Sequence, residues 1–215
     1  MPRIILVHGG CHGAWCWEHL LRFLPSAIAV DLPEYGDGAH EIVSRIDGSA
    51  ILVGHSLGGM AISAAAELAP DRVAGLVYLS ALLPVDGEAA ATMAIPPLGI
   101  EVATRMEGEW CVLDPALSAN LLYHDCPKVI RDAALQRIGR THMSRITSAA
   151  RLSPSRFGAV PKIYVHCEND RAIEIDAQHL MVNRYSGLGR VSLPTGHSPF
   201  LSEPESLARL LSTVI

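Results

Sequence analysis

The sequence predicts an α/β fold, a doubly wound and mainly parallel sheet of six strands with helices on both faces. Short apolar runs rich in Val, Ile and Leu recur along the 215 residues. Segments with the apolar spacing of helices lie between these runs. Each run is nearly continuous rather than alternating, as expected of parallel strands buried on both faces. Strand–helix alternation at this spacing favours right-handed crossover connections.

The six expected strands are bounded by Gly, Pro, Asp or His, residues that favour turns or end apolar runs. They lie at residues 3–8, 27–31, 50–54, 75–80, 162–167 and 190–193. The expected helices have apolar residues on one face. They lie at residues 14–24, 41–46, 57–68, 173–185 and 204–214.

Residues 84–159 do not show this alternation of strands and helices. No strong strand pattern occurs there, and prolines separate several helical pieces at Pro96, Pro97, Pro115, Pro127 and Pro154. A proline interrupts a helix because it lacks the N–H that the helix needs. We therefore expect a helical lid, inserted in the same single domain whose core comprises residues 1–83 and 160–215.

Composition and charge exclude several classes of protein. Apolar residues make up 49% and charged residues 18%, which excludes a disordered chain. The net charge of −5 argues against a protein that binds nucleic acid, because such proteins are usually basic. No run approaches the roughly 18 apolar residues of a membrane span. The five cysteines form no CxxC pair and no leader pattern is present, so we expect a cytoplasmic protein with reduced thiols.

The most informative segment runs from Gly54 to Gly58 and reads Gly-His-Ser-Leu-Gly. This G-x-S-x-G stands between a predicted strand and a predicted helix, where it is typical of a sharp turn that exposes a serine nucleophile. The alternative is a glycine-rich helix start in which Ser56 is only a cap. We take Ser56 as the nucleophile.

A serine hydroxyl needs a base, and the base needs an orienting acid. Among the ten histidines, His197 follows the last predicted strand and so lies at the edge where the other strands end. Asp170 follows the fifth strand after a turn and is the favoured acid. Glu168 is a second candidate, and Asp86, beyond the fourth strand, is the fallback. The order Ser56, Asp170, His197 differs from the two serine-protease orders.

The tetrahedral intermediate of acyl transfer needs two N–H donors for its oxyanion. We expect them from Leu57, directly after the nucleophile, and from Gly10 in the glycine-rich loop after the first strand. The histidines are scattered and no HExxH motif occurs. No metal and no cofactor are therefore expected.

Four segments together resemble the α/β-hydrolase superfamily. The first of them especially resembles the methylesterase and hydroxynitrile-lyase branch with its bacterial carboxylesterase relatives. They are residues 7–17 (VHGGCHGAWCW), 30–33 (VDLP), 53–59 (VGHSLGG) and 196–200 (GHSPF). The resemblance implies a parallel sheet without the leading hairpin of larger hydrolases, and a lid that shapes the pocket over the serine.

The expected activity is a serine-dependent carboxylic-ester hydrolase that cleaves small esters through an acyl-enzyme, without a cofactor. One alternative is a hydroxynitrile lyase on the same scaffold, and another is a non-enzymatic ligand receptor. In the plant lyases of this branch a lysine follows the catalytic histidine and a threonine follows the first-strand histidine. Here Ser198 and Gly9 stand in those places. Epoxide hydrolases and dehalogenases would need an aspartate in place of Ser56.

The chain departs from the resemblance between Asp31 and Ile51, where relatives usually have a full helix. Only one or two turns fit in residues 41–46. We expect an apolar patch on this face of the sheet, which is either a contact for a homodimer or a stability defect.

Overall fold

A computed structural model of the protein, in which residues 2–96 and 98–214 are described, contains a six-stranded sheet. Its order is β2-β1-β3-β4-β8-β9, and every neighbouring pair is parallel. The strands are β1 (Arg3–Val7), β2 (Ile28–Val30), β3 (Ala50–Ser56), β4 (Val73–Ala81), β8 (Lys162–Cys167) and β9 (Gly189–Leu193). The predicted fold class and its six strands are confirmed.

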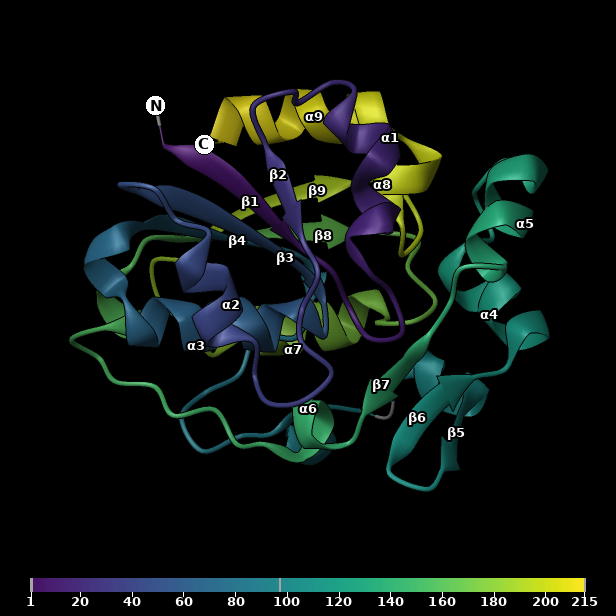
Figure 1. The fold of residues 1–215 in the computed structure, drawn as a ribbon, viewed down its shortest axis with the longest axis horizontal. Helices are drawn as coiled ribbons and strands as arrows, with labels where there is room; N and C mark the ends of the chain where they lie inside the picture. The colour runs from purple at the N-terminus through teal and green to yellow at the C-terminus, as the bar shows by residue number, and fades with distance from the viewer. Residues whose placement is uncertain (1, 97, 215) are drawn as a thin grey trace.

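Helices cover both faces of this sheet (Figure 1). One face is covered by η1 (Ala14–Trp17), α1 (Glu18–Leu21), α8 (Pro199–Ser202) and α9 (Pro204–Val214). The other face is covered by α2 (Ala39–Ser44), α3 (Gly58–Leu68) and α7 (Ile175–Asn183). The single helix expected at residues 14–24 is instead a 3₁₀ turn followed by one α-turn. Short 3₁₀ turns precede two strands: η2 (Pro70–Arg72) before β4 and η5 (Phe157–Ala159) before β8.

The sheet separates two apolar layers. Side chains alternate across a strand, so on β1 the side chain of Ile5 packs with the layer under α2, α3 and α7, whereas that of Leu6 packs with the layer under α1 and α9. On β4, Leu76 and Val77 divide in the same way. The side chains on both faces of these strands are buried, which explains why the strands consist of continuous apolar runs in the sequence.

The insertion, residues 84–159, contains strands as well as helices, and the expectation that it is helical is wrong on this point. A three-stranded antiparallel sheet is formed by β5 (Thr104–Glu107), β6 (Trp110–Leu113) and β7 (Arg140–His142). These strands have only three or four residues, and all four residues of β5 are exposed. The sequence therefore contains no apolar run that would predict them. The remaining elements are η3 (Ala90–Thr92), η4 (Gly99–Ala103), α4 (Pro115–Leu122), α5 (Lys128–Leu135) and α6 (Ser144–Thr147).

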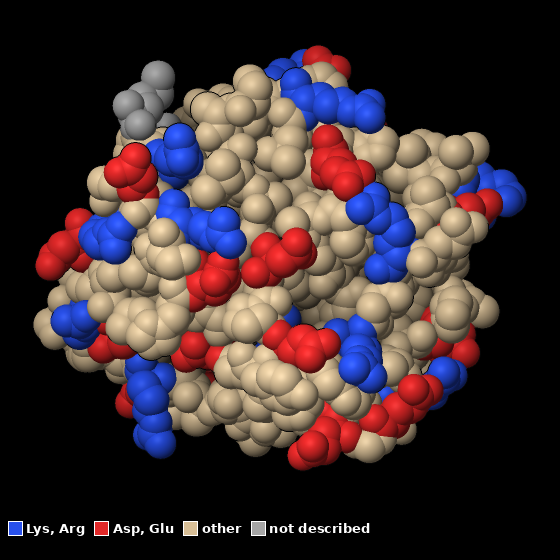
Figure 2. Space-filling view, viewed as in Figure 1, with Lys and Arg blue, Asp and Glu red and all other residues tan. Residues whose placement is uncertain are grey.

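The surface in Figure 2 has acidic and basic side chains interspersed, with uncharged residues between them. No helix within the described ranges is both long and apolar enough to cross a bilayer. All five cysteines are free and buried.

The first turn of α3 lies so close to the end of β4 that a side chain cannot fit between them. A Cβ at Gly59 would overlap the carbonyl oxygen of Leu82, whereas a Cβ at Gly75 would meet its nearest atom, the carbonyl oxygen of Pro161, at 3.8 Å. We expect Gly59→Ala to lower the free energy of unfolding by more than about 2 kcal/mol, because the helix must move away from the sheet. Gly75→Ala, the matched control, should change it by less than about 1 kcal/mol. Urea denaturation of both variants measures this difference, and equal stabilities would contradict the described packing.

Candidate active site

Ser56 lies at the last position of β3, in a turn that leads directly into α3. Its φ is +53°, a left-handed conformation that non-glycine residues rarely adopt. The flanking glycines make this turn sterically possible. A Cβ at Gly54 would lie 2.8 Å from the carbonyl oxygen of Gly58, and a Cβ at Gly58 would lie 2.7 Å from the carbonyl oxygens of Val7 and His8. The G-x-S-x-G pattern therefore forms the predicted sharp turn.

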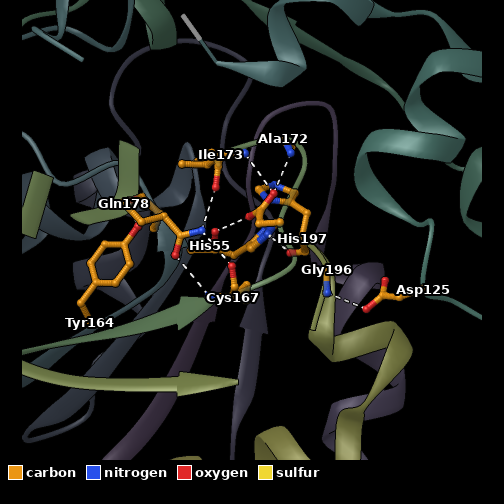
Figure 3. Close-up of polar contacts among 12 residues, drawn as sticks. His55, Asp125, Tyr164, Cys167, Ala172, Ile173, Gln178, Gly196 and His197 are labelled. Atoms are coloured by element: carbon orange, nitrogen blue, oxygen red, sulfur yellow. Dashed lines mark hydrogen bonds and ion pairs between the residues drawn. The ribbon is translucent and has the colours of Figure 1, made fainter. Parts of the chain in front are cut away.

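His197 lies in the loop between β9 and α8, and its Nδ1 is 2.7 Å from Oδ2 of Asp170. Both side chains are buried. Because a carboxylate oxygen accepts, Nδ1–H of His197 is the donor, and Nε2 is left as the basic nitrogen of the neutral ring. The ring of His55 holds the backbone of His197, since Nε2 of His55 donates to the carbonyl oxygen of His197 at 2.9 Å (Figure 3).

Asp170 is held by four donors. Its Oδ1 accepts the N–H groups of Ala172 at 2.7 Å and Ile173 at 2.9 Å (Figure 3). Its Oδ2 accepts the hydroxyl of Ser80 as well as His197. Ser80 is fully buried near the end of β4, with a φ of +37°. Ser80 could not be predicted from the sequence, because nothing in the local sequence indicates that β4 and β8 lie side by side.

The other two candidate acids lie elsewhere. Glu168 is exposed, and its Oε1 accepts the hydroxyl of Ser192 at 2.6 Å. Asp86 accepts the N–H of Leu152 at 2.8 Å, within the insertion. Of the three carboxylates considered, only Asp170 contacts His197.

Gly10 and Leu57 lie on two loops that meet beside Ser56, and all three residues line one cavity. The carbonyl oxygen of Gly10 accepts Nδ1–H of His12 at 2.8 Å, and Nε2 of His12 accepts the hydroxyl of Tyr123 at 2.6 Å. These bonds hold the loop in one orientation. Among the bonds of the described residues, neither the N–H of Gly10 nor that of Leu57 is engaged.

The insertion is hydrogen-bonded to the loop after β1 and to the loop that carries His197. In the loop after β1, the N–H of Cys11 donates to Oγ1 of Thr141 at 2.6 Å, and the carbonyl oxygen of Cys11 accepts the N–H of Gly139 at 2.8 Å. In the loop of His197, the N–H of Gly196 donates to Oδ2 of Asp125 at 2.7 Å (Figure 3). The insertion thus positions the site, a role that could not be predicted from the sequence because these partners are 71 to 130 residues apart.

The cavity above Ser56 has a volume of about 400 Å³. Its polar and ionisable lining residues, cysteines aside, are His12, His55, Ser56, Glu101, Thr104, Thr141 and His197. Apolar residues of the insertion and of the loop after β8 form nearly half of its lining, namely Ala90, Ala91, Met93, Ile95, Pro96, Leu98, Ile100, Leu113, Leu122, Ile146 and Ile173. Within the described part of the chain, Glu101 is the only acidic or basic residue, histidine aside, on this wall.

Two histidines near the site are held neutral. Burial lowers the pKa of His8 and of His12 to about 4. At His8, Nδ1–H donates to the carbonyl oxygen of Gly9 and Nε2 accepts the N–H of Leu32, an arrangement that needs the neutral ring. In residues 2–96 and 98–214, no three His, Cys, Asp or Glu side chains are grouped so that they could hold a metal ion.

The chain matches known hydrolases in sequence and in fold. A family described as "Alpha/beta hydrolase family" matches residues 4–210. Methylesterase 7 of Arabidopsis thaliana is 28% identical, with 97% of this chain and 94% of the relative covered. A pyrethroid hydrolase of Sphingobium wenxiniae is 30% identical, with 97% and 86% covered. The crystal structure of a pyrethroid hydrolase from Sphingobium faniae superposes with a TM-score of 0.87 at 26% identity, covering 99% of this chain and 96% of the other.

The buried neutral histidines predict a loss of stability in acid. The pKa of histidine in an unfolded chain is about 6.5, whereas that of His8 in the fold is about 4. Between pH 6.5 and pH 4, His8 is therefore protonated to a greater extent in the unfolded chain than in the folded protein. The free energy of unfolding therefore falls as the pH drops from 6.5 to 4, by up to roughly 3 kcal/mol for this residue.

The measurement is urea denaturation at several pH values for the wild type, His8→Gln and the exposed control His40→Gln. We expect the dependence on pH between 6.5 and 4 to be weaker in His8→Gln and unchanged in His40→Gln. Parallel curves for all three proteins would contradict the buried, neutral state of His8.

Proposed function

Because the chain belongs to the alpha/beta hydrolase family, we propose that it is a serine carboxylesterase that cleaves small esters through an acyl-enzyme on Ser56. The relatives named above are esterases and hydrolases, and the predicted membership of this superfamily is confirmed by the match over residues 4–210. The observation that carries the proposal is the convergence of Ser56, in its strained turn, and the His197–Asp170 pair on one cavity.

In the first step His197 acts as the general base. Its Nε2 takes the proton of Ser56 Oγ as the oxygen attacks the ester carbonyl carbon. Asp170 holds the ring through Nδ1 and stabilises the positive charge that forms on it. The N–H groups of Gly10 and Leu57 donate to the oxyanion of the tetrahedral intermediate.

The intermediate then collapses, and its C–O bond to the alcohol breaks. The alcohol leaves with the proton from His197 Nε2, and the acyl group stays on Ser56 as an ester. Water enters, His197 takes one of its protons, and hydroxide attacks the acyl carbon through a second intermediate of the same kind. Collapse returns the proton to Ser56 and releases a carboxylic acid.

The insertion would act as the lid of this cavity and select the substrate. The lining of this cavity is mainly apolar and encloses about 400 Å³, near the lower end of ordinary ligand pockets of roughly 300–1,000 Å³. A small ester with apolar acyl and alcohol groups fits both the volume and the chemistry. A cytoplasmic location and a homodimer stay predictions of the sequence.

The direct test is the removal of the nucleophile. We expect Ser56→Ala to lower kcat for p-nitrophenyl acetate by roughly 10³- to 10⁶-fold, the range measured when a triad serine is lost. The matched control is Ser44→Ala, an exposed helical serine whose hydroxyl donates to a backbone carbonyl. It should keep the wild-type rate. Activity in Ser56→Ala within tenfold of the wild type would refute the assignment of the nucleophile.

A second test separates the esterase from a hydroxynitrile lyase. A lyase must stabilise departing cyanide, yet no Lys or Arg among the described residues lines the cavity. Ser198 is fully buried, and Arg171 is exposed with its guanidinium on Oδ1 of Asn120. At Gly9 a Cβ would lie 2.8 Å from Cβ of Ser56, which excludes a threonine without rearrangement.

We therefore expect turnover of p-nitrophenyl acetate and no release of benzaldehyde from mandelonitrile above the uncatalysed background. Absorbance assays on one preparation measure both reactions. Benzaldehyde release at a rate comparable with ester hydrolysis would instead identify a lyase.

A further inference from the structure

A second cavity, of about 340 Å³, lies on the other side of Leu57 from the active site. Its floor is one face of α3, formed by residues at helical spacing: Leu57, Met60, Ala61, Ala64 and Leu68. The short helix α2 packs against α3 but covers only part of that face. The cavity is thus the structural result of the short link between β2 and β3.

The opposite wall presents a cation without a partner. Arg145, on α6, is half-buried, and its guanidinium makes no hydrogen bond or ion pair with any described residue. Burial lowers the pKa of Arg145 to about 10, yet the side chain stays charged near pH 7. A desolvated, unpaired guanidinium is unfavourable on its own and favours a ligand that supplies the missing acceptors.

The other charges around this cavity leave it cationic. Three arginines (Arg145, Arg151 and Arg156) line it, against two carboxylates (Asp37 and Glu67). Arg156 pairs with Glu67, its Nε 3.7 Å from Oε1, which leaves two arginines against Asp37. Both oxygens of Glu67 already accept from Ser153, and one also accepts the N–H of Phe157. Oδ1 of Asp37 accepts the N–H of Ala39. In a chain with a net charge of −5, this is a local site for an anion.

The wall that follows Arg145 is fixed in place. The N–H of Ala150 donates to the carbonyl oxygen of Glu88 at 2.7 Å, and its carbonyl oxygen accepts the N–H of Gly87 at 2.9 Å. The N–H of Leu152 donates to Asp86 Oδ1 at 2.8 Å. A cavity held by such bonds needs little ordering when a ligand enters.

We propose that this second cavity binds an apolar monocarboxylate, with the carboxylate on Arg145 and the apolar part on the exposed face of α3. Guanidinium and carboxylate match in a bidentate geometry, and the floor offers only apolar contacts. The inference rests on the proposed function in one respect, namely that ester hydrolysis releases acids of this class. The site would then bind the product of the neighbouring active site.

Calorimetric titration with benzoate tests the site, and benzamide is the uncharged control ligand. The titrations use Ser56→Ala, with and without Arg145→Gln. The matched charge control is Arg209→Gln, an exposed arginine of α9 outside the cavity. We expect benzoate to bind, Arg145→Gln to weaken it by at least about tenfold because a charge-assisted pair is lost, and Arg209→Gln to have no effect. Ala64→Phe, which fills the cavity without changing charge, should also abolish binding.

Three outcomes would overturn the proposal. Benzoate affinity that survives both Arg145→Gln and Ala64→Phe would place the acid in the catalytic cavity. Equal binding of benzamide would remove the role of charge. A dimer in sedimentation velocity that Arg145→Gln dissociates, without benzoate binding, would make the cavity an interface between copies. None of these depends on catalysis, so Ser56-dependent hydrolysis can stand while this inference fails.

Discussion

The strained turn at Ser56 is the constraint on which the rest of the structure depends. A φ of +53° at a serine is costly, and it persists only if the surroundings allow no alternative. Here β3 enters the turn at the centre of the sheet and α3 leaves it almost at once. The carbonyl oxygen of Ser56 accepts the N–H of Leu82, which joins the turn to the end of β4 at 3.0 Å. This close packing requires glycine around the turn, because a Cβ there would overlap the neighbouring backbone.

The remaining parts of the site are positioned with respect to this turn by hydrogen bonds from distant elements. Asp170 accepts donors from β4, from its own loop and from the loop of His197. The insertion contributes Thr141 to one loop and Asp125 to another. A catalytic geometry must be held within a fraction of an ångström, and the hydrogen bonds of these chain segments supply that rigidity. The insertion is therefore part of the positioning scaffold as well as a wall of the cavity.

Much of the fold could be predicted from the sequence, because its strongest signals come from burial. Continuous apolar runs predicted all six core strands, and helical spacing predicted α3 and α9 at nearly their observed bounds. The glycine pattern around Ser56 indicated a turn that few sequences allow. For the proposed site, Ser56 was predicted from the G-x-S-x-G pattern, and His197 and Asp170 were predicted from their places after β9 and β8.

What the sequence did not predict depends on contacts between distant residues. Ser80 has a role only because β4 lies beside β8, and Thr141 only because β7 reaches the loop after β1. The strands β5 to β7 are short and partly exposed, so their pairing leaves no periodic trace. The second cavity could not be predicted from the sequence, since the position of Arg145 beside α3 depends on how the insertion folds.

The central claim is that Ser56 is the activated nucleophile, and covalent labelling with diethyl p-nitrophenyl phosphate measures it most directly. This reagent transfers its phosphoryl group to an activated serine, and the deacylating water displaces that group slowly. Intact-mass spectrometry with peptide mapping should find one diethylphosphoryl group per chain, on Ser56, formed far more slowly in His197→Ala. A label on another residue, or none while ester hydrolysis continues, would contradict the account.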